Sequence, residues 1–271
     1  MADQRAAAER FLALHVRGEP LLMPNAWDVG SARMLASLGI DAIATTSGGF
    51  AASLGRLDYN VTREEAIAHG AALAAAVQVP VSADLEDCYA QDSGGVAETV
   101  RRARDAGLAG GSIEDWSSSD GGTLLEPELA AERVAEAAAA AAQDGGAFVL
   151  TARAENYLRG NPDLDDTIAR LTAYERAGAD VLYAPGLPDL DALREIVAAV
   201  TKPVNVLITP ALASVGELAV AGAARISLGG SLAFSAYGAA LTAVRELQQG
   251  SGRYLAQSRQ GMREVREALG D

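Results

Sequence analysis

Residues 79–87 read Val-Pro-Val-Ser-Ala-Asp-Leu-Glu-Asp, a short apolar run that ends in acidic residues. Proline suits the start of a strand, because no hydrogen-bond donor is needed there. Helical patterns flank the run, near 62–77 and 94–106, and a second apolar run follows at 110–114. This alternation predicts parallel strands covered by helices.

The same alternation recurs along the chain. Eight such units in 271 residues predict a single (β/α)8 TIM barrel over residues 1–250. The alternative is an open doubly wound sheet, which normally has a glycine-rich loop after its first strand; the turn Pro24–Asp28 has no glycine. Strands are expected near 20–24, 41–46, 79–84, 110–114, 147–152, 180–184, 203–207 and 223–227, and helices near 28–38, 62–77, 94–106, 127–142, 163–177, 189–200, 212–220 and 231–247.

Both ends of the chain extend the barrel. The first ~17 residues have a helical pattern and are expected to cap the barrel floor. Residues 251–271 carry mixed charges at helical spacing beyond the eighth barrel helix. They are expected to form a C-terminal helical extension, not a separate domain.

Charge and cysteine content exclude several classes of protein. The formal net charge of −14 disfavours binding to nucleic acid or to an anionic membrane. A single cysteine, Cys88, rules out an intrachain disulfide and fits a reducing compartment, so a cytoplasmic protein is expected. We see no signal peptide, and no segment approaches the ~20 uninterrupted apolar residues of a membrane span.

Acidic residues follow two neighbouring predicted strands. Asp84 and Glu86 end the third strand, and Glu114 ends the fourth. In a barrel these strand ends meet at the active face, where uncompensated carboxylates repel one another. A hard divalent cation would remove that repulsion, which predicts a Mg²⁺ site with Mn²⁺ as the alternative. The competing interpretation is that the acids cap helices or pair with arginines.

Other polar groups at the strand ends are candidates for binding a small carboxylate substrate. Arg153 can bind an anion through two points, or it can form a salt bridge to Glu155 or Glu114. Ser47-Gly48-Gly49 offers consecutive backbone donors, although Gly-Gly is also an ordinary turn. Asn205 either reaches the mouth or satisfies barrel backbone. Trp27, after the first strand, is a further candidate.

Eight pieces of sequence carry a resemblance by their order and spacing. They are Asn25-Ala26-Trp27-Asp28-Val29-Gly30-Ser31-Ala32-Arg33, Thr46-Ser47-Gly48-Gly49, Ala83-Asp84-Leu85-Glu86-Asp87-Cys88-Tyr89, Ser112-Ile113-Glu114-Asp115, Thr151-Ala152-Arg153, Ala184-Pro185-Gly186, Lys202-Pro203-Val204-Asn205 and Arg225-Ile226-Ser227. Together they resemble the isocitrate lyase/phosphoenolpyruvate mutase superfamily, from Pro24 to about Ala240.

The resemblance implies roles for particular residues. It implies magnesium at Asp84, Glu86 and Glu114, and carboxylate binding by the backbone of residues 47–49. It also implies anion binding by Arg153. Asp58 matches an acid that approaches the reacting centre in several members. Members break or make a C–C or C–P bond beside a carboxylate through an enolate. They are often tetramers that exchange a terminal helix, so the tail is expected to pack on a neighbouring subunit of a dimer or tetramer.

The loop after the fourth strand departs from the superfamily pattern. Its lyases carry Lys-Lys/Arg-Cys-Gly-His there, whereas residues 115–122 read Asp-Trp-Ser-Ser-Ser-Asp-Gly-Gly. The lysine and asparagine of the mutases are also absent. Asp58 and Arg153 are then the catalytic candidates, with Asp58 for proton transfer. The leading hypothesis is a magnesium-dependent lyase of a 2-oxo or 2-hydroxy acid. Phosphonopyruvate-type C–P chemistry and carboxylate binding without turnover are the alternatives.

Overall fold

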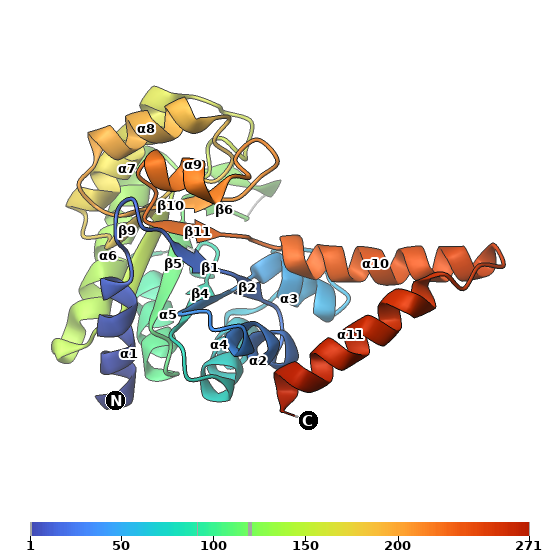
Figure 1. Ribbon diagram of the computed structural model, residues 1–271. Helices are drawn as coiled ribbons and strands as arrows, with labels where there is room; N and C mark the ends of the chain where they lie inside the picture. Colours follow the sequence, from blue (N-terminus) through green and yellow to red (C-terminus); the bar gives the residue numbers. More distant parts are fainter. Residues whose placement is uncertain (1, 91, 119–120, 271) are drawn as a thin grey trace.

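Parallel strands form a ring at the centre of the computed structural model, which describes every residue except 1, 91, 119, 120 and 271 (Figure 1). All eight predicted barrel strands are present, so the predicted fold is confirmed. The strands are β1 (Leu21–Met23), β2 (Asn25–Ala26), β3 (Ile43–Thr45), β4 (Val81–Asp84), β5 (Gly110–Glu114), β8 (Val149–Arg153), β9 (Val181–Tyr183), β10 (Val204–Leu207) and β11 (Arg225–Ser227).

The first predicted strand is divided in two, and this division closes the ring. β1 pairs with β11 and β2 pairs with β3, all in parallel. Only Pro24 separates β1 from β2. Proline has no N–H for a ladder bond, but its carbonyl still accepts a bond of 3.0 Å from Ala44 N. The two ends of the strand order therefore belong to one extended segment.

Eight helices follow the barrel strands, within a few residues of the predicted ranges. Several begin at a side chain that accepts a bond from the first turn: Asp28 caps one helix, and Thr62 and Glu65 form a capping box on another. The helices are α2 (Val29–Ser37), α4 (Arg63–Ala76), α5 (Ser93–Asp105), α6 (Pro127–Ala142), α7 (Leu164–Arg176), α8 (Leu190–Ala199), α9 (Val215–Val220) and α10 (Ser231–Gln248).

Two elements were not expected from the sequence. Residues Ser47–Ser53 form a short helix, α3, whose first turn is capped by the Thr46 side chain. The alternative of an ordinary turn at Ser47-Gly48-Gly49 is therefore not what the structure contains, because Thr46 supplies a helix N-cap. The loop after β5 forms a hairpin of β6 (Trp116–Ser117) and β7 (Thr123–Leu124).

The N-terminal helix α1 (Ala2–Ala13) covers the floor of the barrel, as predicted. Phe11 is fully buried and packs with Met23, Val149 and Val181, which lie on three strands. Apolar burial of this kind fixes the helix across the lower ends of the strands.

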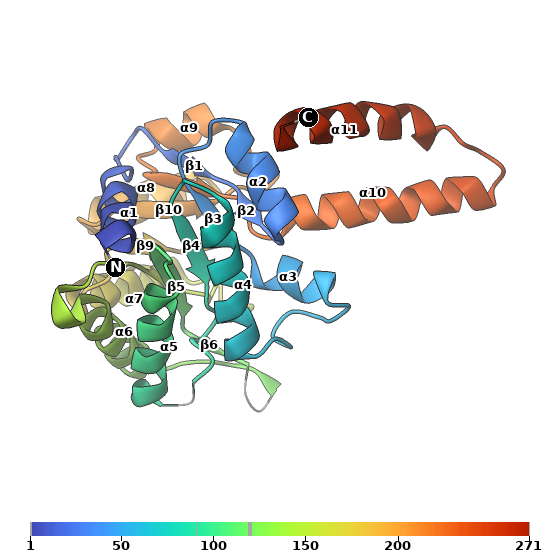
Figure 2. The same cartoon turned by 90° about the horizontal axis from the view of Figure 1, so that it is seen from below.

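The last two helices form an arm that projects from the barrel. α10 leaves the barrel, and α11 (Tyr254–Leu269) turns back towards α2 (Figures 1 and 2). The eighth barrel helix was expected on the barrel surface, yet only Ala233 of α10 is buried. On the first strand, Leu22 is 45% exposed. Large apolar side chains are exposed on the arm: Phe234, Leu241, Val244, Leu247, Leu255, Met262, Val265 and Leu269.

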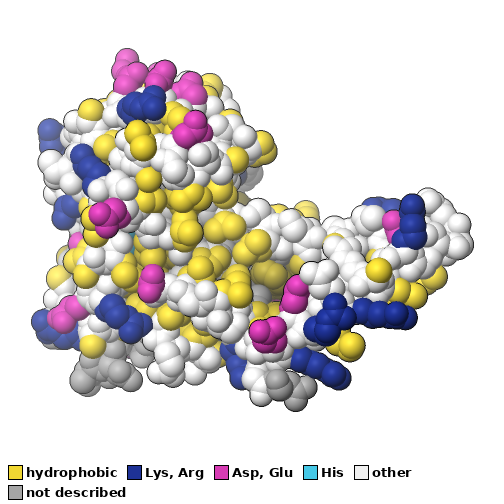
Figure 3. Space-filling view, in the orientation of Figure 1, with side chains coloured by type: hydrophobic (Ala, Val, Ile, Leu, Met, Phe, Trp, Pro, Cys, Tyr) yellow, Lys and Arg dark blue, Asp and Glu magenta, His cyan; other side chains and the backbone are white. Residues whose placement is uncertain are grey.

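The surfaces of the body and of the arm carry different kinds of side chain. Hydrophobic side chains gather on the body beside the base of the arm, and arginine side chains line the arm itself (Figure 3). Among the described residues, no helix is long and apolar enough to cross a bilayer.

Candidate functional site

A cavity of about 380 Å³ opens at the carboxyl ends of the strands. Such a volume lies in the range of small-molecule sites. Its wall brings together most of the side chains expected from the sequence, although these lie up to 158 residues apart in the chain. Those that line it are Ser47, Gly48, Asp58, Asp84, Glu114, Arg153 and Asn205.

Arg153 is the central cation of this cavity. Its Nη1 atom lies 2.9 Å from Asp84 Oδ1 and 3.2 Å from Glu114 Oε2. Its Nη2 atom lies 2.6 Å from Glu155 Oε1. The salt-bridge alternative is therefore what the structure contains. Arg159 Nη2 also lies 3.2 Å from Glu155 Oε2, so two guanidinium groups face three carboxylates and the acids still outnumber the cations.

Glu86 lies behind this cluster and lacks compensation. It is 3% exposed, and its Oε1 atom has no hydrogen-bond partner among the described residues. Burial, reinforced by the charges of Asp84 and Asp58, raises the pKa of Glu86 to about 9. Burial likewise raises the pKa of Glu114 well above its ordinary value. A buried carboxylate oxygen without a donor is a group that a divalent cation would satisfy.

The carboxylates do not form a ready-made cage. Within the described part of the chain, no three acidic, histidine or cysteine side chains converge on one point. The Arg153 side chain instead bridges Asp84 and Glu114.

The loop that carries Glu86 has an unusual backbone. Glu86, Cys88 and Tyr89 have φ angles of 50°, 60° and 52°, in the left-handed region that non-glycine residues rarely adopt. Arg133 holds this loop: its Nη2 donates to the carbonyls of Asp87 and Ala90, at 2.6 and 3.0 Å. Strain of this kind is common at functional sites.

Asp58 lies on the loop after α3 at the edge of the cavity. Desolvation of its carboxyl raises its pKa, although part of the side chain meets solvent, and the charge of Asp84 adds to the effect. A Cβ atom at Gly48 would lie 3.2 Å from Asp58 Oδ2. Glycine at this position therefore leaves room for the carboxyl.

Three predicted site residues do not line the cavity: Trp27, Gly49 and Glu86. The Trp27 ring lies against Tyr237 of α10, with ring centres 6.5 Å apart. A Cβ atom at Gly49 would lie 2.6 Å from Thr46 Cγ2 and 3.1 Å from Trp27 Cβ. Gly49 thus allows close packing beneath α3.

Asn205 is 1% exposed and bonded to two side chains. Its Nδ2 donates to Ser227 Oγ at 2.9 Å, and its Oδ1 accepts from Arg225 Nε at 2.9 Å. The bonds found for its side chain go to side chains and not to barrel backbone. Its position on the cavity wall supports the first of the two alternatives for Asn205.

Tyr59 and Arg159 also line the cavity and were not expected from the sequence, and Glu155, expected only as a salt-bridge partner of Arg153, lines it too. Tyr59 Oη donates to Glu114 Oε1 at 2.6 Å and contacts Arg159. The Arg159 guanidinium lies over the rings of Tyr59 and Trp116, at 5.2 and 4.3 Å. Their positions in the sequence could have indicated them, because Tyr59 directly follows Asp58 and Arg159 lies six residues after Arg153.

The hairpin after β5 occupies the place where the superfamily lyases carry their cysteine loop. Trp116 anchors it, since a Cβ atom at Gly122 would lie 2.3 Å from the Trp116 ring. Residues 119 and 120 lie outside the described residues. Cys88, the lone cysteine, is fully buried, and burial raises its pKa to about 12. It therefore has the properties of a packed side chain and not of a nucleophile.

Comparison with known proteins agrees with this arrangement. A sequence pattern described as phosphoenolpyruvate phosphomutase matches residues 11–248. The chain belongs to the phosphoenolpyruvate phosphomutase family. The superfamily expected from the eight pieces of sequence is thus confirmed.

Three proteins to which this chain is similar are a solved structure and two sequences. A Burkholderia cenocepacia structure, described as a candidate lyase or mutase, is 45% identical with a TM-score of 0.93, over 100% of this chain and 98% of its own. An uncharacterised Mycobacterium tuberculosis protein is 38% identical over 83% of each chain. Oxaloacetate decarboxylase 2 of Pseudomonas fluorescens is 30% identical over 82% of this chain and 78% of its own.

Proposed function

We propose that this protein is a magnesium-dependent lyase, which cleaves or forms a C–C bond beside the carboxylate of a small 2-oxo or 2-hydroxy acid. The observation that carries the proposal is the buried Glu86 carboxyl, which has an unpartnered oxygen and lies near Asp84 and Glu114. The similarity to an oxaloacetate decarboxylase supports C–C chemistry at this site.

Asp84, Glu86 and Glu114 would hold the metal, with Mn²⁺ as an alternative to Mg²⁺. When bound, the cation offsets negative charge that grows on substrate oxygens beside the broken bond. It would also relieve the repulsion that raises the pKa of Glu86.

Arg153, Ser47, Gly48 and Asn205 would bind and orient the substrate carboxylate. Arg153 offers two N–H groups in one plane, which match the two oxygens of a carboxylate. Ser47 already directs its N–H and hydroxyl to Asp84 Oδ2, at 3.2 and 3.0 Å. Trp27 and Gly49 would support this wall from behind, through their packing under α3.

Asp58 would transfer the proton. Its raised pKa increases the fraction that is protonated near neutral pH, which suits a general acid. Arg153 would assist as the cation facing the developing charge. In this scheme Asp58 transfers the proton, and no residue of the hairpin after β5 does so.

The decisive experiment is an assay with Mg²⁺ and a panel of oxaloacetate, 2-methylisocitrate, 2,3-dimethylmalate and phosphonopyruvate, with pyruvate and phosphate measured. Pyruvate without phosphate supports the lyase. Pyruvate with phosphate supports C–P chemistry instead, and ligand-induced thermal stabilisation without product supports a binding protein.

Asp84→Ala should abolish Mg²⁺ binding by calorimetry, whereas Asp105→Ala, on the exposed surface, should not. Unchanged binding in Asp84→Ala would overturn the metal assignment.

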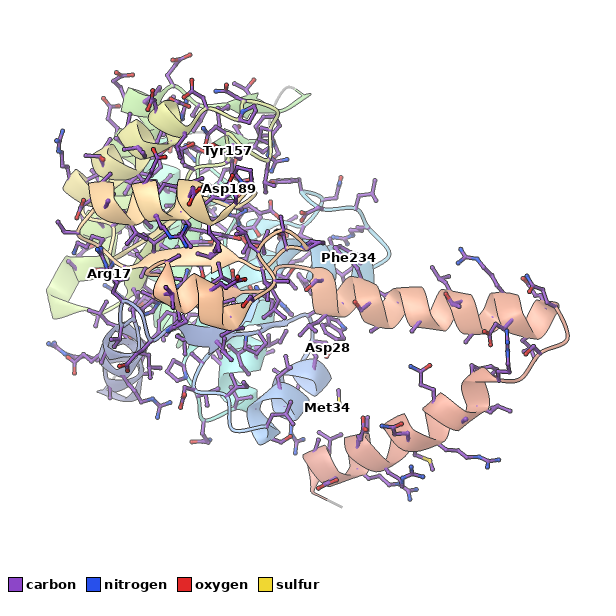
Figure 4. All side chains as sticks on the ribbon, turned by 45° about the horizontal axis from the view of Figure 1, so that its top comes forward. Arg17, Asp28, Met34, Tyr157, Asp189 and Phe234 are labelled. Atoms are coloured by element: carbon purple, nitrogen blue, oxygen red, sulfur yellow. The ribbon has the colours of Figure 1, made fainter. Side chains whose placement is uncertain are left out.

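We also propose that the protein forms a dimer or tetramer through the arm of α10 and α11, with residues 251–271 on a neighbouring subunit. The exposed Leu22 on β1 and the exposed Leu241 and Leu247 on α10 support this, because burying such side chains stabilises association. Figure 4 shows Phe234 at the base of the arm, where it also lines the cavity. Light scattering should give an oligomer, and Leu241→Glu with Leu247→Glu should give a monomer. A monomeric native protein contradicts the proposal.

A further inference from the structure

Arg225 is a charged side chain at the bottom of the cavity. It lies at the start of β11, is 3% exposed, and lines the cavity wall. Nε donates to Asn205 Oδ1 at 2.9 Å, and Nη2 donates to Thr151 Oγ1 at 3.1 Å. Nη1 lies 3.1 Å from His15 Nε2. The guanidinium therefore spans the barrel interior beneath the carboxylate cluster.

All three partners of Arg225 are uncharged. His15 directs Nδ1 to the Phe11 carbonyl at 2.8 Å, which leaves Nε2 to accept from the arginine. Burial, aided by the charge of Arg225, lowers the pKa of His15 to about 3, so the ring is neutral near pH 7. Among the described residues, no carboxylate forms an ion pair with Arg225. Burial lowers the pKa of the guanidinium to about 9.

A buried cation without an anion is costly for the fold. Removing a charged group from water costs several kcal/mol unless an opposite charge compensates it. The guanidinium also has five N–H donors, and the three bonds above leave one on each Nη atom. Arg153, by contrast, has three carboxylates around it. The cavity thus has a cation paired with carboxylates near its mouth and one without a carboxylate at its floor.

We propose that Arg225 forms a second anion subsite, which binds the distal acidic group of a dicarboxylic acid whose first carboxylate lies at the mouth. This assignment rests on the proposed function for the position of the first carboxylate. Asn205 connects the two levels, because it accepts from Arg225 and donates to Ser227 on the cavity wall. The floor then selects diacids over monocarboxylic acids of equal length.

The test compares succinate with butyrate, which differ in one terminal carboxylate. Calorimetry with the wild-type protein in Mg²⁺ should give at least about tenfold tighter binding of succinate. In Arg225→Met, succinate binding should weaken by about 10- to 100-fold, while butyrate binding changes by no more than about threefold. Arg104→Met is the matched control, since Arg104 donates to backbone carbonyls outside the cavity, and it should leave both affinities unchanged.

A purely structural role gives a different pattern. Arg225→Met would then lose both acids equally, or neither, and either result overturns the subsite. Where Arg225→Met does not fold, the wild-type comparison still decides, because equal binding of succinate and butyrate overturns the proposal. Arg225→Lys keeps a charge without the planar fork and should retain part of the preference for succinate. Binding is measured without turnover, so a failed lyase assay does not affect this result.

Discussion

Glu114 and Asp115 are neighbours in the chain, and both are almost fully buried carboxylates with opposite surroundings. Glu114 points into the cavity, where it shares Arg153 with Asp84. Asp115 points away from it and accepts from Arg170 at 2.9 Å, from Tyr174 at 2.6 Å and from the Glu155 backbone at 2.8 Å.

Asp115 has the contacts of a residue that stabilises the fold, whereas Glu114 faces the cavity, where a ligand can bind. Asp115 accepts hydrogen bonds on both oxygens, and its cation, Arg170, pairs with only one other carboxylate, Asp166. Glu114 belongs to a cluster in which acids outnumber the nearby cations, and Glu86 beside it has an oxygen with no donor. We therefore expect substitutions on the Asp115 side to change stability, and those on the Glu114 side to change the response to pH and metal.

The largest effect is expected for Asp115→Ala. It leaves the Tyr174 hydroxyl buried without its acceptor and removes one of the two carboxylates that pair with Arg170, which should lower the free energy of unfolding by about 2–4 kcal/mol. Urea denaturation at pH 7 measures this. Asp105→Ala, which removes a carboxylate that is 67% exposed, should change it by less than about 0.5 kcal/mol. A cost below about 1 kcal/mol for Asp115→Ala would remove the contrast.

The second effect is a pH dependence that Glu86→Gln should reduce. Folding raises the pKa of Glu86 from 4.5 to about 9, so the folded state binds more protons between those values. The free energy of unfolding of the metal-free protein should then fall as pH rises from 5 to 8, by up to about 1.4 kcal/mol per unit from this group. Urea denaturation in a chelator measures both proteins, and identical slopes would contradict the assignment.

Two tyrosines give a finer comparison, because each donates to one of the neighbouring carboxylates at 2.6 Å. Tyr174→Phe removes a bond to a charged group in a closed site. It should lower the free energy of unfolding by about 1.5–3 kcal/mol in urea denaturation. A cost as small as that of an exposed substitution would show that Asp115 does not need this donor.

Tyr59→Phe should have the smallest effect on stability. Tyr59 is only half-buried at the cavity, where water can replace the lost hydroxyl at Glu114. We expect a change of no more than about 0.5 kcal/mol in the same measurement. A loss equal to that of Tyr174→Phe would mean that the cavity wall is as rigid as the core behind it.

The sequence predicted the barrel well because its strands and helices have distinct periods and end at recognisable residues. The position of α10 could not be predicted, because an apolar stripe such as Leu241 and Leu247 is the same whether it covers its own barrel or another surface. The short helix α3 was missed because Gly48-Gly49 has low helix propensity, which the Thr46 cap overcomes.

The acidic residues of the candidate site were predicted from the sequence, and their ion-pair and hydrogen-bond partners were predicted less well. Asp84 and Glu114 could be placed together because both end neighbouring strands. Arg153 forms ion pairs with three carboxylates, which depend on side-chain distances. The hydrogen bond from Tyr59 to Glu114 depends on such a distance and on a positive φ at Tyr59. The role of Arg225 could not be predicted beyond its place in the resemblance, because nothing in the sequence shows that a buried arginine lacks a carboxylate.

The left-handed loop at residues 86–89 also contains a natural chemical probe of its own opening. Cys88 is the protein's single cysteine and is fully enclosed beside Glu86, so an alkylating reagent can reach it only when the surrounding structure opens. The rate of thiol labelling therefore reports the opening equilibrium of the loop, without any engineered cysteine. A ligand that ties Glu86 to its neighbours would slow that labelling, and the slowing could be followed by mass spectrometry in a crude mixture of small acids.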